Sequence, residues 1–279
     1  MKKTLKAAVK TLIDASVAAM GATAAGRYLF YRITANAMGL TRSTTHGGTT
    51  LTFAAPNELA RARTDSFSSK EPETLEWIDG IPRGAVLWDV GANVGLYTCY
   101  AAKARECRVF AFEPSVFNLE LLARNVFLNG LGDTVVIVPL PLSEELGVSR
   151  LNMSSTDWGG AMSTFGETYG HDGRELKTIF DFPTMGLSMP DAVNLLKIPQ
   201  PDYIKMDVDG IEHLILKGGL PVLRGVKGVI IEINEEFAAQ DAGAAESLRR
   251  AGLTLQAKKR ADIAVTGAAA QFYNQIWVR

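Results

Sequence analysis

From residue 71 onward the chain alternates short apolar runs with segments of helical character, and this alternation is the strongest constraint on its fold. Runs such as VVIV (135–138) and GVIIEI (228–233) are apolar on both faces, as expected of strands that helices cover on either side. Strands that alternate with helices form a parallel, doubly wound sheet, so we predict an α/β protein. The expected strands are 85–90, 108–114, 134–142, 202–209, 226–236, 253–258 and 271–279. The expected helices are 72–81, 95–104, 115–130, 189–198, 210–219 and 243–252, and residues 143–190 are expected to be irregular.

Polar side chains stand where four of the predicted strands end. The first strand ends at Asp89 and the second at Glu113. The fourth ends at Asp207, and the fifth carries Glu232 near its end. In doubly wound sheets, ligands bind beyond the carboxyl ends of the strands. Several acids along one edge are costly unless something uses them, so this edge is the predicted ligand site.

The segment VLWDVGANVGLYT (86–98) places Gly91 and Gly95 in a short turn between a strand and a helix. Such a turn can aim the free N–H groups of the helix N-terminus at a ligand, or it can be a connection that merely needs small residues. Glu113 favours the ligand, because an acid 22 residues beyond Gly91 can accept both hydroxyls of a ribose. We therefore expect a ligand that contains a nucleoside.

Two residues of this turn bear on which nucleoside it is. Asn93 stands where the dinucleotide-binding motif has its second glycine. Asp89 would repel a pyrophosphate but suits a cationic or amine-bearing ligand. S-adenosylmethionine carries a ribose, a positive sulfonium and an amino-acid end, so it fits these residues better than NAD does.

Four stretches, WDVGANVGLYT, FAFEPSVFN, IKMDVDGIEHLILKGG and VIIEINEEF, together resemble the FkbM family of S-adenosylmethionine-dependent methyltransferases. The resemblance covers roughly residues 70–234 and returns in NQIWVR at the C-terminus. It implies a class I methyltransferase fold, which is a Rossmann-like, doubly wound sheet of seven strands with the last strand antiparallel. It also implies methyl transfer, usually to an oxygen, on sugars or other small molecules.

On this resemblance, the turn after the first strand holds the cofactor and the acid that ends the second strand holds the ribose. Asp207 would lie between cofactor and acceptor, and three residues ahead of the first strand could close over the cofactor. The resemblance assigns no residue to the adenine, for which three residues of the irregular segment are candidates. The residues of the cofactor turn are Asp89, Gly91, Asn93 and Gly95, and the ribose acid is Glu113. The residues ahead of the first strand are Lys70, Glu71 and Thr74, and the candidates for the adenine are Ser143, Asp157 and Trp158.

A hydroxyl that accepts a methyl group must lose its proton, and a general base at the sheet edge can take it. The candidates for this catalytic role are Asp207, His213 and Glu232. His213 can equally be an ordinary residue of a first helical turn, because Asp209 and Glu212 have the spacing of a capping box. Carboxylates here could also hold Mg²⁺, but nothing fixes their mutual spacing, so we expect no metal.

Residues 1–69 are expected to form an N-terminal extension, and residues 70–279 the methyltransferase domain. The first 26 residues have the outline of a signal peptide, but Lys10 and Asp14 interrupt the apolar part. Apolar residues at helical spacing favour an amphipathic helix instead, with a short strand at 49–55 further on. This helix can pack on its own chain or form a homodimer, and its lysines also allow peripheral contact with a membrane.

Charge and cysteine content narrow the function further. The formal net charge of −1 gives no argument for nucleic acid as a partner. Cys99 and Cys107 match no metal spacing and indicate reduced thiols in a cytoplasmic protein. The length of segment 143–190 favours a role in binding the acceptor, a small molecule or a glycan. Two alternatives stay open: an NAD-dependent oxidoreductase on a similar sheet, and a non-catalytic, membrane-associated protein that binds the cofactor.

Overall fold

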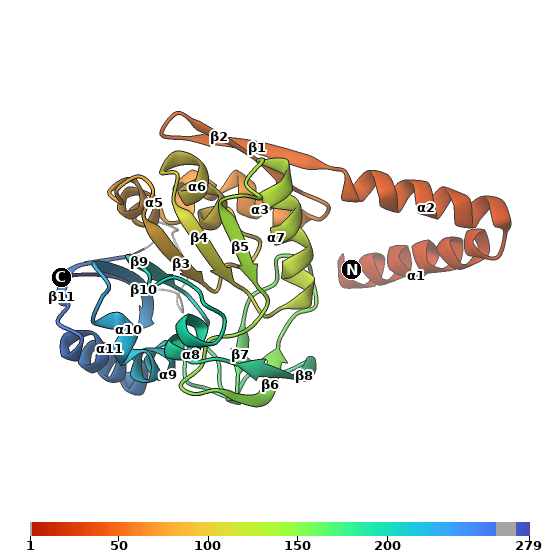
Figure 1. Cartoon of the computed structure of the whole chain (residues 1–279). Coiled ribbons are helices and arrows are strands. Elements are labelled where there is room, and N and C mark those ends of the chain that lie inside the picture. The colour runs from red at the N-terminus through yellow and green to blue at the C-terminus, as the bar shows by residue number, and fades with distance from the viewer. Residues whose placement is uncertain (1, 261–271) are drawn as a thin grey trace.

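A central sheet organises the protein, shown in Figure 1 as a computed structural model that describes residues 2–260 and 272–279. The seven strands of this sheet are β3 (Val86–Val90), β4 (Arg108–Phe112), β5 (Val135–Val138), β9 (Tyr203–Met206), β10 (Gly228–Asn234), β11 (Thr254–Lys259) and β12 (Phe272–Val278). Their order is β11-β12-β10-β9-β3-β4-β5. Neighbours from β10 to β5 are parallel, whereas β12 is antiparallel to both β10 and β11. The predicted doubly wound sheet with an antiparallel last strand is confirmed, although Gln271 of that strand lies outside the described residues.

Helices cover both faces of the sheet, as its apolar central strands require. The core on one face includes Leu75, Cys99 and Leu122, and the core on the other includes Trp88 and Leu216. Both cysteines are buried, free thiols. The helices of the first face are α5 (Pro72–Asp79), α6 (Leu96–Ala104) and α7 (Val116–Leu128); those of the second are α8 (Met189–Asn194), α9 (Glu212–Gly218), α10 (Leu220–Leu223) and α11 (Ala238–Arg250).

The segment 143–190, expected to be irregular, instead contains a small antiparallel sheet. Its strands are β6 (Gly147–Met153), β7 (Ser163–Phe165) and β8 (Phe180–Gly186), with β6 in the centre. Leu151 and Met153 of β6 alternate into the main core. The sequence concealed this sheet because β7 has only three residues and β8 carries Pro183, a residue that argues against a strand.

The chain begins with two helices, α1 (Lys2–Gly21) and α2 (Ala24–Met38), that form a hairpin projecting from the rest of the molecule (Figure 1). α1 is the expected helix, whereas α2 was not predicted. Its apolar side chains follow no clear helical stripe, and its start is marked mainly by Thr23, whose side chain caps the N–H of Gly26. Within the described residues, no helix is both long and apolar enough to cross a membrane.

Residues 41–70 connect this hairpin to the sheet and pack closely on it. The elements are β1 (Thr41–His46), β2 (Thr49–Ala54), α3 (Glu58–Asp65) and α4 (Phe67–Lys70), of which only β2 was expected. Leu51 and Phe53 of β2 and Phe67 of α4 are buried in the same core as Tyr100 of α6. The division of the chain at residue 69 stays a prediction, but the segment just before it shares a core with the sheet.

Candidate active site

An open cavity of about 500 Å³ lies at the carboxyl ends of β3, β4, β9 and β10. This is where ligands bind in doubly wound sheets. Residues from three strand-end turns, from β10 and from the junction of α4 with α5 meet in it. The predicted site residues that line the cavity are Lys70, Glu71, Gly91, Asn93, Glu113, Asp207 and Glu232.

The turn after β3 brings main chain against main chain. Gly91 has a φ of +79°, and a Cβ placed there would lie 1.8 Å from the carbonyl oxygen of Asp207. The N–H of Gly91 donates to the carbonyl of Phe112 at 3.0 Å. Gly95 precedes α6 with a φ of +80°, and a Cβ there would lie 2.3 Å from Leu122 Cδ1. Glycine is therefore required at both positions, and at Gly91 the backbone itself forms the cavity wall.

Glu113 lines the cavity from the end of β4, and two main-chain donors fix its carboxylate. The N–H of Asn93 donates to one oxygen at 2.8 Å, and the N–H of Ser115 donates to the other at 2.7 Å. A carboxylate can accept about four hydrogen bonds, so each oxygen can still accept one from a ligand hydroxyl. Burial raises the pKa of Glu113 to about 7, although the two N–H donors oppose the rise.

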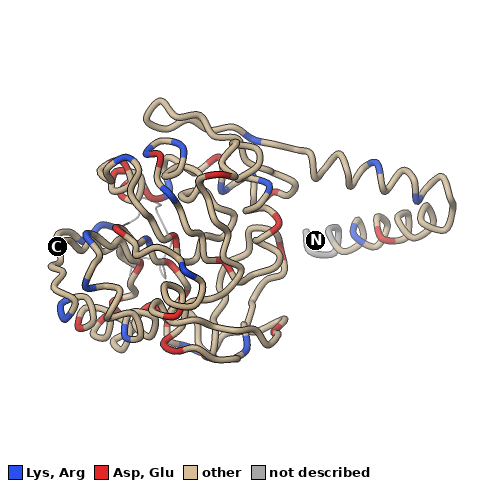
Figure 2. The backbone as a smooth tube through the Cα atoms, viewed as in Figure 1, with Lys and Arg blue, Asp and Glu red and all other residues tan. Residues whose placement is uncertain are grey.

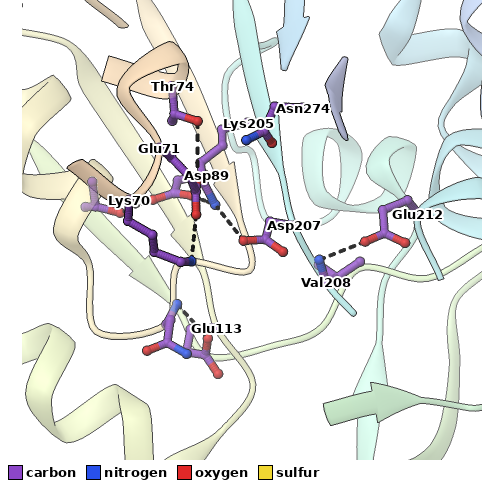
Figure 3. Close-up of polar contacts among 12 residues, drawn as sticks. Lys70, Glu71, Thr74, Asp89, Glu113, Lys205, Asp207, Val208, Glu212 and Asn274 are labelled. Carbon is purple, nitrogen blue, oxygen red and sulfur yellow. Dashed lines mark hydrogen bonds and ion pairs between the residues drawn. The ribbon is translucent and has the colours of Figure 1, made fainter. Parts of the chain in front are cut away.

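Asp89, expected to suit a cationic ligand, is buried beside a cation of the protein itself. Lys205 Nζ lies 3.3 Å from Asp89 Oδ1 and 3.8 Å from Asp207 Oδ2 (Figure 3). Thr98 Oγ1 donates to the other oxygen of Asp89 at 2.5 Å. Burial lowers the pKa of Lys205, but Asp89 and Asp207 outweigh it, so the pKa is raised overall. Lys205, which the sequence did not single out, therefore stays charged and links Asp89 to Asp207.

Lys70, Glu71 and Thr74 meet at the start of α5 (Figure 3). Lys70 Nζ lies 2.6 Å from Glu71 Oε1, and Thr74 Oγ1 donates to Glu71 Oε2 at 3.3 Å. Burial raises the pKa of Glu71, but the charges of Lys70 and Lys205 outweigh it and lower the pKa overall. Lys70 and Glu71 thus present a charged pair to the cavity, and Thr74 supports Glu71 from behind.

Three carboxylates, those of Asp207, Asp209 and Glu232, line another part of the cavity wall. Burial, together with the negative charge of Asp207, raises the pKa of Asp209 to about 6. The same two causes raise the pKa of Glu232 well above its usual value. Within residues 2–260 and 272–279, the Glu232 carboxyl makes no hydrogen bond or ion pair. A carboxyl that is both basic and unengaged can accept a proton from a bound hydroxyl.

The expected capping box at the start of α9 is wrong. Asp209 instead accepts hydrogen bonds from the N–H groups of residues 162–163, at 2.7 and 3.2 Å, and so ties the small sheet to β9. Glu212 does reach back, accepting from the N–H groups of Val208 and Gly210, each at 3.0 Å (its bond to Val208 is drawn in Figure 3). Asp209 points elsewhere because the chain turns at Gly210, where φ is +123°.

A further wall of the cavity is a main-chain segment, residues 158–160, that side chains from several elements hold in place. Gly160 lines the cavity, and Gly159 has a φ of +83°. The sequence gave no signal for this arrangement, because the donors and the segment lie far apart along the chain. Asn57 donates to Trp158 O at 3.0 Å, and Arg63 donates to Gly159 O at 2.8 Å. Asn93 and Asn118 both donate to Gly160 O, at 2.8 and 3.0 Å, and Asn118 also accepts from the N–H of Gly159 at 3.0 Å.

Several other candidates lie away from the cavity. His213 is half-buried on α9, with its ring 5.7 Å from that of Phe237, and burial lowers its pKa. By contrast His171, a loop residue with no predicted role, lines the cavity. Ser143 Oγ donates to Glu145 O at 2.7 Å. The predicted site residues that do not line the cavity, within the part of the chain that the structure describes, are Thr74, Asp89, Gly95, Ser143, Asp157, Trp158 and His213.

Comparison with known proteins agrees with this geometry. A hexuronic acid methyltransferase of Haloferax volcanii, AglP, is 31% identical over 158 residues, which are 56% of this chain and 59% of that protein. The methyltransferase sdnD of Sordaria araneosa is 26% identical over 164 residues, which are 50% of this chain and 62% of that protein. The chain therefore spans less than two thirds of the length of either relative.

A solved structure from Streptococcus mutans, described as "a putative sam-dependent methyltransferase", has the same fold. Its TM-score is 0.51 at 11% identity, and the alignment covers 86% of this chain and 55% of that one. The model of the methyltransferase FkbM domain matches residues 89–253, which run from the acid that ends β3 to the start of β11. Because this match covers more than half of the sequence, the chain belongs to the FkbM methyltransferase family.

Proposed function

We propose that this protein is an S-adenosylmethionine-dependent methyltransferase that methylates a hydroxyl group of a sugar or glycan. The observation that best supports this cofactor is that Gly91 and Glu113 both line one end of the cavity. Gly91 lines the cavity with bare backbone, and Glu113 has lone pairs left for the hydroxyls of a ribose. The family match and the two relatives, both named as methyltransferases, support the same reaction.

When bound, S-adenosylmethionine supplies a methyl group that its sulfonium has already activated. The chain's own residues orient what binds, and such alignment can account for a large share of the rate enhancement. Glu113 orients the ribose, and Lys70 with Glu71 offers both charges to the zwitterionic amino-acid end. Asp207, tethered by Lys205, stands between this end and the acceptor.

We assign the general base to Glu232. Asp207 is already engaged, because its carboxylate lies 3.8 Å from the Lys205 ammonium. His213 does not line the cavity in the described part of the chain. Glu232 lines it, is unengaged and has a raised pKa, so its carboxylate accepts the proton that the acceptor hydroxyl loses.

The charge of the cavity favours an uncharged sugar as the acceptor. Asp207, Asp209 and Glu232 line this side, and Lys70 is already paired with Glu71. A uronate would bring another negative charge to these carboxylates and would be repelled. The Haloferax volcanii relative is named for a hexuronic acid. For this chain we propose a neutral sugar hydroxyl.

Calorimetric titration tests the cofactor, and transfer of a labelled methyl group tests the acceptor. We expect wild type to bind S-adenosylhomocysteine and not NAD, and the Glu113→Ala variant to lose that binding. Glu120→Ala is the matched control, because Glu120 is a half-exposed acid on α7 that pairs with Arg124. Binding of NAD in place of S-adenosylhomocysteine would favour the oxidoreductase. Binding of the cofactor without transfer to any member of a panel of methyl glycosides and uronosides would favour a non-catalytic protein.

We also retain, as proposals, the division of the chain into residues 1–69 and 70–279 and a cytoplasmic location. The projecting hairpin supports the first, because it stands apart from the sheet that carries the family match. The second follows from the cofactor, which an exported protein would leave behind. A role of the hairpin in contacting a partner surface is argued next.

A further inference from the structure

The hairpin of α1 and α2, residues 2–38, is called the arm below. It projects from the molecule (Figure 1). The burial of its residues is described from Ala7 onward, and among these only Gly26, which has no side chain, is buried. A helix gains stability in a protein mainly by burying an apolar face, and the arm buries almost none of its own. Something outside this chain is therefore needed to cover it.

The arm exposes large apolar side chains on both helices. Those of α1 recur at spacings of three and four residues, so they share one side of the helix. On α2, Tyr28 and Tyr31 are 62% and 66% exposed, with their ring centroids 6.3 Å apart. Patches of this kind mark sites of interaction with proteins or membranes. The exposed residues are Val9, Leu12, Ile13, Val17, Met20, Tyr28, Leu29, Tyr31 and Ile33.

Charge is divided unevenly between the arm and the rest of the chain. Residues 1–38 contain six Lys or Arg and one acid, Asp14, which gives a net charge of +5. The remaining 241 residues contain 23 Lys or Arg and 29 acids, which gives −6. In Figure 2 the coloured part of the arm is marked mainly by basic residues, whereas the domain carries residues of both signs. The arm is therefore a basic, apolar element attached to an acidic body.

We propose that the arm binds the surface of a membrane that contains anionic lipids. Basic residues beside an apolar stripe are the pattern of helices that lie in the headgroup region, and tyrosines are favoured there. Pairing of two arms in a dimer would bring two charges of +5 together, which is repulsive. The arm lies on the membrane rather than through it, since neither helix is apolar enough to span one. This proposal does not depend on the reaction that the cavity catalyses.

Sedimentation of the full chain with lipid vesicles tests the proposal. We expect the wild type to sediment with vesicles of phosphatidylcholine and phosphatidylglycerol, more weakly with phosphatidylcholine alone, and less as salt is added. Lys10 and Arg32 are exposed on the two helices, and each basic residue near an anionic surface contributes about fivefold to binding. The Lys10→Gln, Arg32→Gln double variant should therefore lower the partition coefficient roughly 30-fold.

The control variant loses the same amount of positive charge, but at positions outside the arm. Lys103→Gln with Lys177→Gln removes two exposed lysines of the domain and should leave vesicle binding unchanged. A Leu12→Gln variant, at a site 69% exposed, should weaken binding without affecting folding. Equal loss in the control and arm variants would overturn the proposal. So would a chain that stays in the supernatant with anionic vesicles, above all if light scattering shows a dimer that Leu12→Gln dissociates.

Discussion

The two ends of the cavity differ in how their polar groups are satisfied. At the cofactor end, main-chain N–H groups of Asn93 and Ser115 fix Glu113, and Asn93 and Asn118 hold the carbonyl of Gly160. At the acceptor end, Glu232 has no partner in the described residues and faces the like charge of Asp207. The cofactor end is ordered before anything binds, whereas the acceptor end holds Glu232, a carboxyl whose pKa is raised and whose lone pairs are free in the described residues.

This contrast indicates which end tolerates change. A site made from main-chain groups and glycines depends on backbone geometry, so substitutions there should impair binding. A site that relies on one unengaged carboxyl depends on side-chain chemistry, so substitution of that carboxyl should impair turnover while the cofactor still binds. Four substitutions, taken from the largest expected effect to the smallest, test whether the two ends separate in this way.

Glu232→Gln should lower kcat while leaving the affinity for S-adenosylhomocysteine within twofold. Loss of a general base reduces the rate roughly 10²- to 10⁴-fold. The measurement is methyl transfer to the best acceptor in the glycoside panel, beside calorimetry. Glu235→Gln is the control, because Glu235 follows β10 but pairs with Lys258. If His213→Gln lost activity and Glu232→Gln kept it, the base would be assigned to the wrong residue.

Gly91→Ala should act on the other end and weaken binding of S-adenosylhomocysteine. The added Cβ would clash with the carbonyl of Asp207, and the alanine would have to adopt a φ of +79°. The turn would have to move to relieve this clash, and contacts with the cofactor worth about 2–3 kcal/mol, roughly 100-fold in affinity, would be lost. Gly132→Ala is the control, since a Cβ at Gly132 meets nothing within 4 Å. Unchanged affinity in a folded Gly91→Ala variant would show that the turn does not contact the cofactor.

The proposed contact of Glu113 with the ribose predicts that cofactor binding depends on pH. With its pKa raised to about 7, the carboxyl is mostly charged at pH 8 and mostly protonated at pH 6. Protonation removes an acceptor for the ribose hydroxyls, so the affinity for S-adenosylhomocysteine should fall about tenfold from pH 8 to pH 6. Glu113→Gln should bind weakly at both values, with that slope gone. A wild-type affinity that is flat across this range would contradict the assignment.

Asn118→Ala should have the smallest effect, because it leaves the remaining donors to segment 158–160 in place. Losing hydrogen bonds worth about 1 kcal/mol should weaken S-adenosylhomocysteine binding about fivefold. Asn194→Ala, at an exposed position in α8, is the control. A loss as large as that of Gly91→Ala would mean that the wall of residues 158–160 orders the cofactor end as strongly as the turn does.

The sequence predicted the sheet well because its signals are local. Apolar runs marked the central strands of the main sheet, and Gly91 and Glu113 belong to short turns that the local sequence identifies. Lys205 could have been noticed, since a lysine in an apolar strand needs an acid nearby, and Asp207 is two residues on. That spacing places both side chains on one face of the strand.

The rest of the site depends on contacts that join distant parts of the chain. Arg63 and Asn118 bond to a segment between 40 and 100 residues away, and no local pattern reports such a pairing. The small sheet was missed because its signals, a three-residue strand and a strand with a proline, are weak. Asp209 was misassigned because spacing alone cannot show that Gly210 turns the chain between it and Glu212.

The contact between Gly91 and residue 207 has a consequence for how such a site can diversify. It is made to the carbonyl oxygen of residue 207 and not to its carboxylate. Any residue at 207 offers the same carbonyl, so this contact places no demand on the side chain, which is held separately by Lys205. A substitution at position 207 can therefore keep the backbone contact, while position 91 is confined to glycine throughout.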